Sequence, residues 1–138
     1  MTKDLNVLDV AVATNVLQHD MDTSPIGDPK GLLSGINMIL LPADTKMVEL
    51  MCSCLADRNI HYKKGNIATG DQFIATKEQK DYISNTFDAI AAEMEGGSIG
   101  HVCYVNKVPF AILRSISDGD GGETDTRPLR RRLRISRL

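Results

Sequence analysis

The stretch Glu-Met-Glu-Gly-Gly at residues 93–97 decides the fold, because it joins two segments with different apolar periods. The residues before it, 89–94, form a short apolar run of the length of a strand. The residues after it, 97–106, place Ile99, Val102 and Cys103 on one side of a helix. Strands that alternate with helices are typical of an α/β sheet. The carboxylates at this junction are therefore expected at the carboxyl end of a strand, where such sheets bind ligands.

Other parts of the chain repeat this alternation. The pattern predicts further strands at 7–16, 65–69 and 109–116, a strand or turn at 37–41, and helices at 44–58 and 77–87. Residues 19–35 are rich in proline and glycine, which predicts a long loop. Asp44 is a plausible N-cap of the clearest helix. The apolar side chains of that helix recur at i, i+3, i+4, i+7 and i+8, which predicts its apolar face: Met47, Leu50, Met51, Cys54 and Leu55.

Length and composition indicate one ordinary globular domain. The chain has 138 residues, 42% of them hydrophobic, and a net charge of −2. No apolar run approaches the roughly 20 residues of a membrane span. The N-terminus lacks the apolar core of a signal peptide. Three cysteines without framework spacing favour a reduced, cytoplasmic setting.

Charge is unevenly distributed along the chain. Residues 1–126 carry 10 Lys+Arg and all 18 Asp+Glu, whereas residues 127–138 carry six arginines and no acid. We therefore predict a domain at residues 1–123 and an arginine-rich tail at 124–138. The tail is interpreted as a disordered, solvated run of charge.

Four motifs in order resemble one enzyme family. They are Gly-Asp-Gln-Phe-Ile at 70–74, Ala-Glu-Met-Glu-Gly at 92–96, His-Val-Cys at 101–103, and Val-Pro-Phe at 108–110 followed by Arg-Ser-Ile-Ser-Asp at 114–118. Together they resemble the 5′-methylthioadenosine/S-adenosylhomocysteine nucleosidases of the purine nucleoside phosphorylase superfamily. The resemblance runs from about Leu5 to Glu123, and His-Asp-Met-Asp at 19–22 fits it. It implies a partial three-layer α/β fold of the nucleoside phosphorylase type, with a mixed central sheet.

The resemblance also implies an activity, which is hydrolysis of the bond between adenine and ribose in these two nucleosides, within methionine salvage. Glycoside hydrolysis passes through an oxocarbenium-like state. Asp118 matches the general acid that protonates the leaving adenine, and for this it needs a pKa above the usual ~3.9. Glu95 matches the residue that binds the ribose hydroxyls. Neither a cofactor nor a metal is implied.

Supporting roles follow from the same resemblance. Phe73 would stack on the adenine, the backbone of Ile74 would bond to the purine edge, and Met94 would pack under the ribose. Arg114 and Ser117 would orient Asp118. Gly96 and Gly97 would allow close approach of the helix start.

The resemblance also implies partners, and the sequence departs from the family in its N-terminal part. Family members are dimers in which the segment matching residues 19–35 reaches the partner's active site, so we expect a homodimer and a small nucleoside as partners, without a membrane and without nucleic acid. The family's N-terminal part, with a water-activating glutamate, has no counterpart in the sequence. Glu93 is expected to be one residue out of phase with the ribose-binding position, so that its side chain points to the face of the strand opposite to that of Glu95. We therefore expect the chain as given to be nearly inactive.

Alternative interpretations stay open at this stage. A purine nucleoside phosphorylase would use phosphate where a nucleosidase uses water. A non-catalytic chain would bind anionic surfaces or nucleic acid through the basic tail. Zinc at Cys52 and Cys54, or at His101 and Cys103, is disfavoured because positions i and i+2 of a helix point about 200° apart. His19 with its neighbouring aspartates is interpreted as a capped loop entry rather than a metal site.

Overall fold

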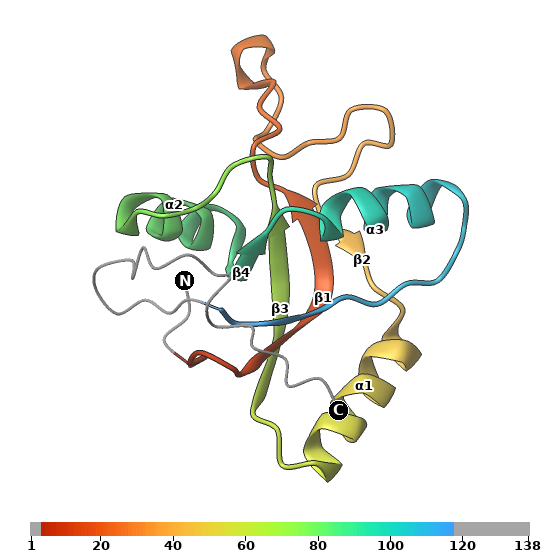
Figure 1. Cartoon of the computed structure of the whole chain (residues 1–138). Helices are drawn as coiled ribbons and strands as arrows, with labels where there is room; N and C mark the ends of the chain where they lie inside the picture. The colour runs from red at the N-terminus through yellow and green to blue at the C-terminus, as the bar shows by residue number, and fades with distance from the viewer. Residues whose placement is uncertain (1–3, 118–138) are drawn as a thin grey trace, which may run out of the picture.

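A mixed five-stranded sheet forms the centre of the molecule (Figure 1). The computed structural model describes residues 4–117, and Asp118 and the predicted tail lie outside the described residues. The strand order is β2-β1-β3-β4, with β5 also paired to β1. β1, β3 and β4 are parallel, whereas β2 and β5 run antiparallel to β1. The strands are β1 Val10–Gln18, β2 Leu41–Pro42, β3 Tyr62–Thr69, β4 Ala89–Glu93 and β5 Leu113–Ser115.

Helices cover both faces of this sheet and make three layers. The α-helices are α1 Thr45–Asp57, α2 Lys77–Phe87 and α3 Gly96–Val105, and a short 3-10 helix, η1, spans Ser24–Ile26. Val10 and Val12 of β1 pack with α1, and Leu17 packs with α2. The alternate side chains of β1, Ala11 and Ala13, belong to the core on the other face, which α3 covers. The predicted α/β fold with a mixed central sheet is confirmed.

Local side-chain hydrogen bonds fix the N-termini of two helices. The Asp44 carboxylate accepts a hydrogen bond from Met47 N at 2.9 Å, so the predicted N-cap of α1 is confirmed. Thr76 and Gln79 form a reciprocal capping box at the start of α2, and this helix has its predicted bounds. Within residues 4–117 no helix is both long and apolar enough to cross a membrane.

The predicted apolar face of α1 is right only in part, because Leu55 of that face packs against the core shared with β1 but other members do not. Val48 and Cys52 are the buried residues of this helix, whereas Leu50 is 66% exposed and Met47 is 38% exposed. The buried stripe lies one position away from the predicted one because α1 packs on β1 through Val48 and Cys52. Both stripes have helical spacing, so the contact with β1, rather than the periodicity, selects the face.

Strand bounds differ from the predictions where the backbone leaves the extended region. β1 begins at Val10 rather than at residue 7, because Leu8 has a positive φ of 79°. β1 also continues to Gln18, two residues beyond its predicted end. The apolar run 109–116 contributes only Leu113–Ser115 as a strand, and most of 37–41 lies outside regular strands. The carboxyl ends of the three parallel strands nevertheless align, since Gln18 pairs with Thr69 and Thr69 pairs with Glu93.

Candidate active site

Glu93 lies at the centre of the polar groups at this aligned edge. Its side chain is only 9% exposed. It accepts hydrogen bonds from Gly96 N at 2.7 and 2.9 Å and from Glu95 N at 3.2 Å, and also from the Thr69 hydroxyl. A carboxylate at the first turn of a helix is stabilised by the free N–H groups there. Glu93 therefore fixes the start of α3 against the end of β4.

Arg114 joins two carboxylates across this edge. Its Nε lies 2.9 Å from Glu93 Oε2, its Nη2 also binds that oxygen, and Nη2 lies 2.9 Å from Glu95 Oε2. The prediction that Glu93 points away from Glu95 is therefore wrong. β4 ends at Glu93, and residues two apart share a side in any case, so both carboxylates reach one guanidinium.

Electrostatics keep Glu93 ionised. Burial by itself raises the pKa of this carboxyl group. The hydrogen bonds from Thr69, Gly96, Arg114 and Glu95 outweigh burial and hold the pKa below its usual value of 4.5. Glu93 is thus a permanent negative charge at neutral pH, and Arg114 has a fixed partner.

Close approach of α3 depends on Gly97. A Cβ on this residue would lie 2.8 Å from Thr69 Cβ and 3.2 Å from Leu17 O. The absence of a side chain lets Gly97 N donate a 2.6 Å hydrogen bond to Thr69 Oγ1, whose hydroxyl in turn donates to Glu93. Thr69 is the residue of this edge that sequence reasoning missed. The available signal is its position as the last residue of a predicted strand, directly after Ile67 and Ala68.

The predicted substrate-binding residues follow two neighbouring strands. Met94 and Glu95 come directly after β4, and Phe73 and Ile74 come after β3. Phe73 is 68% exposed and the Glu95 side chain is 63% exposed, so both are accessible to a ligand. Met94 is also exposed, whereas Ile74 is partly buried against the core under α2. A hydrogen bond of 3.2 Å from Gly70 N to Glu93 O joins the two segments.

The loop entry after β1 lies at the same edge. His19 N donates to Thr69 O at 2.9 Å, and Asp20 Oδ2 accepts from Asp71 N at 2.7 Å. Asp22 Oδ1 accepts from Ser24 N at 2.9 Å at the start of η1. These bonds make a capped loop entry, as predicted. Burial lowers the pKa of His19 below its usual 6.5, and the charge of Asp20 offsets this only in part.

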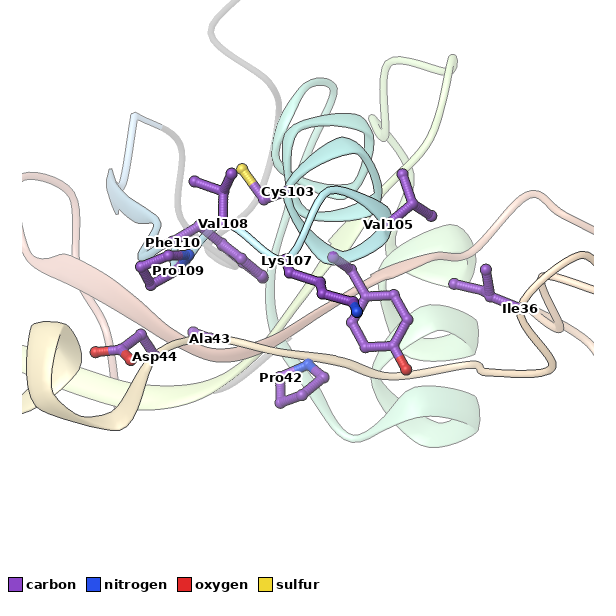
Figure 2. A pocket seen from close by; sticks show the side chains of 11 residues that line it. Ile36, Pro42, Ala43, Asp44, Cys103, Val105, Lys107, Val108, Pro109 and Phe110 are labelled. Carbon is purple, nitrogen blue, oxygen red and sulfur yellow. The ribbon is translucent and has the colours of Figure 1, made fainter.

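A separate cavity of about 750 Å³ opens at the other end of α3. Figure 2 shows Pro42, Asp44, Lys107, Pro109 and Phe110 around it. None of the predicted substrate-binding residues lines this cavity. The candidate site is therefore the polar edge around Glu93 rather than this cavity.

The fold and this polar edge define an α/β protein with a carboxylate–arginine site at the carboxyl ends of parallel strands, and a comparison with known families gives the class. The model of the phosphorylase superfamily matches residues 1–134. The chain therefore belongs to the phosphorylase superfamily.

Individual relatives narrow the comparison. The chain is 39% identical to the aminodeoxyfutalosine nucleosidase of Helicobacter pylori (strain J99), over 86% of this chain and 51% of that protein. It is 38% identical to the 5′-methylthioadenosine/S-adenosylhomocysteine nucleosidase of Oceanobacillus iheyensis, over 88% of this chain and 53% of that protein. The crystal structure of the Campylobacter jejuni 5′-methylthioadenosine/S-adenosylhomocysteine nucleosidase matches with a TM-score of 0.84 at 38% identity, over 91% of this chain and 54% of that one. The chain spans about half the length of the relatives that it matches.

Proposed function

We propose that this protein acts in hydrolysis of the N-glycosidic bond of adenine nucleosides, with 5′-methylthioadenosine and S-adenosylhomocysteine as substrates. The observation that carries the proposal is the Arg114 guanidinium held between buried Glu93 and exposed Glu95. The segment that carries Phe73 starts at Gly70, whose N–H donates to Glu93 O. The names of the relatives support the reaction class. We place this reaction in methionine salvage and in the cytoplasm.

Each residue has a distinct task in this proposal. Phe73 stacks on adenine, the Ile74 backbone bonds to the purine edge, and Met94 packs under the ribose. Glu95 binds the ribose hydroxyls, and its charge favours the positive ring of the transition state over the neutral ground state. Arg114 holds Glu95 in place, because Glu93 keeps Arg114 fixed from the other side.

Asp118 is proposed as the general acid that protonates the leaving adenine. Asp118→Asn keeps the shape of the side chain and removes its proton. General acid catalysis contributes typically 10²–10⁴-fold to rate. We expect a loss of that order in adenine release by a protein of the relatives' full length that includes this chain, and an unchanged rate there would refute the role.

Self-association is part of the proposal. The loop after β1 carries Ile26, which is 82% exposed, and Figure 1 shows this loop extending beyond the sheet. Val102 of α3 is 62% exposed. Such apolar side chains are covered when two copies associate. We propose a homodimer of domains that extend over residues 1–123, and sedimentation at micromolar concentration should give a mass above the 15.1 kDa of one chain.

The test measures ligand binding and product together. The 138-residue chain is titrated with adenine and with 5′-methylthioadenosine in a calorimeter, and Glu95→Gln is the matched variant. We expect Glu95→Gln to weaken 5′-methylthioadenosine binding less than it lowers the rate of adenine release, because the charge acts mainly in the transition state. Adenine binding should stay unchanged, since only the nucleoside carries ribose. Failure of the wild-type chain to bind either ligand would contradict the proposal.

Product analysis separates the reaction types and the substrates. The chain as given is expected to turn over slowly, so it is incubated at high concentration with 5′-methylthioadenosine, with and without inorganic phosphate. Adenine and sugar products are followed by chromatography. A free sugar product supports hydrolysis, whereas a sugar phosphate that appears only with phosphate would indicate a phosphorylase. Aminodeoxyfutalosine is tested in parallel, because the name of the Helicobacter relative favours it as a second substrate.

A further inference from the structure

The residues that follow β1 hold the segment that follows β3. Asp20 Oδ2 accepts a 2.7 Å hydrogen bond from Asp71 N, a contact between residues 51 positions apart. His19 N donates to Thr69 O at 2.9 Å, which extends the pairing of β1 and β3 by one step. The segment 71–74 follows β3, but its start is held by residues that follow β1.

Packing at Gly70 makes this contact tight. A Cβ on Gly70 would lie 2.3 Å from His19 Nε2 and 3.0 Å from Asp20 Cγ, so there is no room for a side chain. Gly70 N also donates to Glu93 O at 3.2 Å. The ends of β1, β3 and β4 consequently meet at one glycine, and Asp20 and His19 lie directly against it.

Two polar atoms at this contact have no hydrogen-bonding partner. Among residues 4–117, His19 Nε2 and Asp20 Oδ1 are buried without one. Buried polar groups that stay unpaired reduce stability, so each needs a reason for being there. An apolar pair would fill the same space at lower cost, which argues that Asp20 serves a purpose other than stability.

The segment that Asp20 holds has few other supports. Residues 71–75 lie outside regular helices and strands. The Gln79 side chain accepts hydrogen bonds from Ala75 N at 3.2 Å and Thr76 N at 3.1 Å and so fixes the far end of the segment. Between these two anchors Ile74 packs against the core under α2, whereas Phe73 is 68% exposed and gains little from packing.

From these contacts we propose that Asp20 is a positioning residue for base binding. Its carboxylate fixes Asp71 N–H and thereby presets the backbone that presents Phe73 and Ile74, with His19 as the packing support. The inference rests on the proposed function, because base binding by Phe73 and Ile74 belongs to that function. A preset segment loses less freedom on binding, so the ligand binds more tightly.

Three substitutions separate positioning from general stability. Asp20→Ala removes the acceptor, and Asp20→Ser repeats the removal with a polar side chain that is too short to reach. Asp20→Asn keeps an acceptor oxygen and should restore binding. Asp22→Ala is the matched control, since Asp22 lies in the same loop and bonds to Ser24 instead of Asp71. Urea unfolding of each variant serves as the check that it is folded at the temperature of the binding measurement.

Adenine and 5′-methylthioadenosine are the probes, and the dissociation constant of each is measured by calorimetry. Loss of one hydrogen bond changes an equilibrium constant by up to roughly tenfold, and an amide oxygen can replace the carboxylate as its acceptor. We expect Asp20→Ala and Asp20→Ser to raise the dissociation constants of both ligands about tenfold. The ratio of the two constants should stay the same, because the contacts to the ribose are unchanged. Asp20→Asn and Asp22→Ala should bind as the wild type does. Unchanged adenine affinity in both Asp20→Ala and Asp20→Ser would overturn the proposal.

Amide proton exchange tests the same contact without a ligand. The exchange rate of the Asp71 amide, measured by NMR, should rise about tenfold in Asp20→Ala and stay at the wild-type rate in Asp20→Asn and Asp22→Ala. Equal rates in wild type and Asp20→Ala would overturn the positioning role. If the wild type binds no adenine but the Asp71 amide responds as expected, the proposed function fails and the contact between the two loops stands.

Discussion

Replacement of Glu93 by glutamine should destabilise the protein strongly, although it exchanges only one carboxylate oxygen for an amide nitrogen. The side chain is 9% exposed and binds Arg114, Thr69 and the amide of Gly96. Each hydrogen bond to a charged group contributes about 1.5–3 kcal/mol. Arg114 keeps Glu95 as a partner, which offsets part of the loss. We expect Glu93→Gln to lower the free energy of unfolding by about 2–4 kcal/mol.

Glu95→Gln is the matched comparison, because it removes the other carboxylate from the same guanidinium. Its side chain is 63% exposed, and exposed ion pairs contribute about 0–1 kcal/mol. Urea unfolding at pH 7, followed by far-UV circular dichroism, measures both variants against the wild type. The reasoning is refuted if Glu95→Gln costs as much as Glu93→Gln, or if Glu93→Gln costs less than about 1 kcal/mol.

Acid titration adds an independent check with a defined sign. The pKa of Glu93 in the folded protein lies below its usual value of 4.5. Its stabilising contribution is therefore complete above pH 4.5 and is lost as the pH falls through the folded-state pKa. Other carboxylates also titrate in this range, so the measured quantity is the difference between variants. The gap in unfolding free energy between wild type and Glu93→Gln should narrow as the pH falls below 4.5.

Three further predictions address other parts of the site. Burial lowers the pKa of His19 below 6.5, so the unfolded state takes up the proton first and the free energy of unfolding should fall as the pH drops below 6.5. Urea midpoints at pH 7.5 and 5.5 should therefore differ less in His19→Gln than in the wild type. Gly97→Ala should lower the unfolding free energy by about 1–3 kcal/mol, since its Cβ would lie 2.8 Å from Thr69, whereas Gly35→Ala, with nothing within 4 Å, should change it little; equal effects would refute the close-approach argument. Phe73→Ala should weaken adenine binding by about 1–3 kcal/mol in calorimetry and leave the urea midpoint nearly unchanged, because Phe73 is 68% exposed, and intact adenine affinity would exclude stacking.

Local chemistry made some elements predictable from the sequence. α2 has its predicted bounds because Thr76 and Gln79 form a capping box, and Asp44 caps α1 through its own carboxylate. The strand-to-helix junction at residues 93–97 was also visible, since the apolar period changes there.

Long-range contacts were not predictable in the same way. The pairing of Arg114 with Glu93 and Glu95 joins residues about twenty positions apart, and no local pattern specifies it. The buried face of α1 depends on the contact with β1, which periodicity does not encode. The roles assigned to Phe73, Ile74, Met94, Glu95 and Asp118 remain predictions from family resemblance, and Asp118 lies outside the described residues.

The pairing of β1 has a consequence for the order of events during synthesis. One edge of this strand is shared by β2 and β5, and residues 113–115 pair with Val10–Val12. A growing chain emerges N-terminus first, so the first strand waits for about a hundred residues before its last neighbour leaves the ribosome. Until then the backbone of Val10–Val12 is open on that side to another nascent chain. Slow translation before residues 113–115 have left the ribosome should therefore favour co-translational aggregation, whereas a pause after their exit should not.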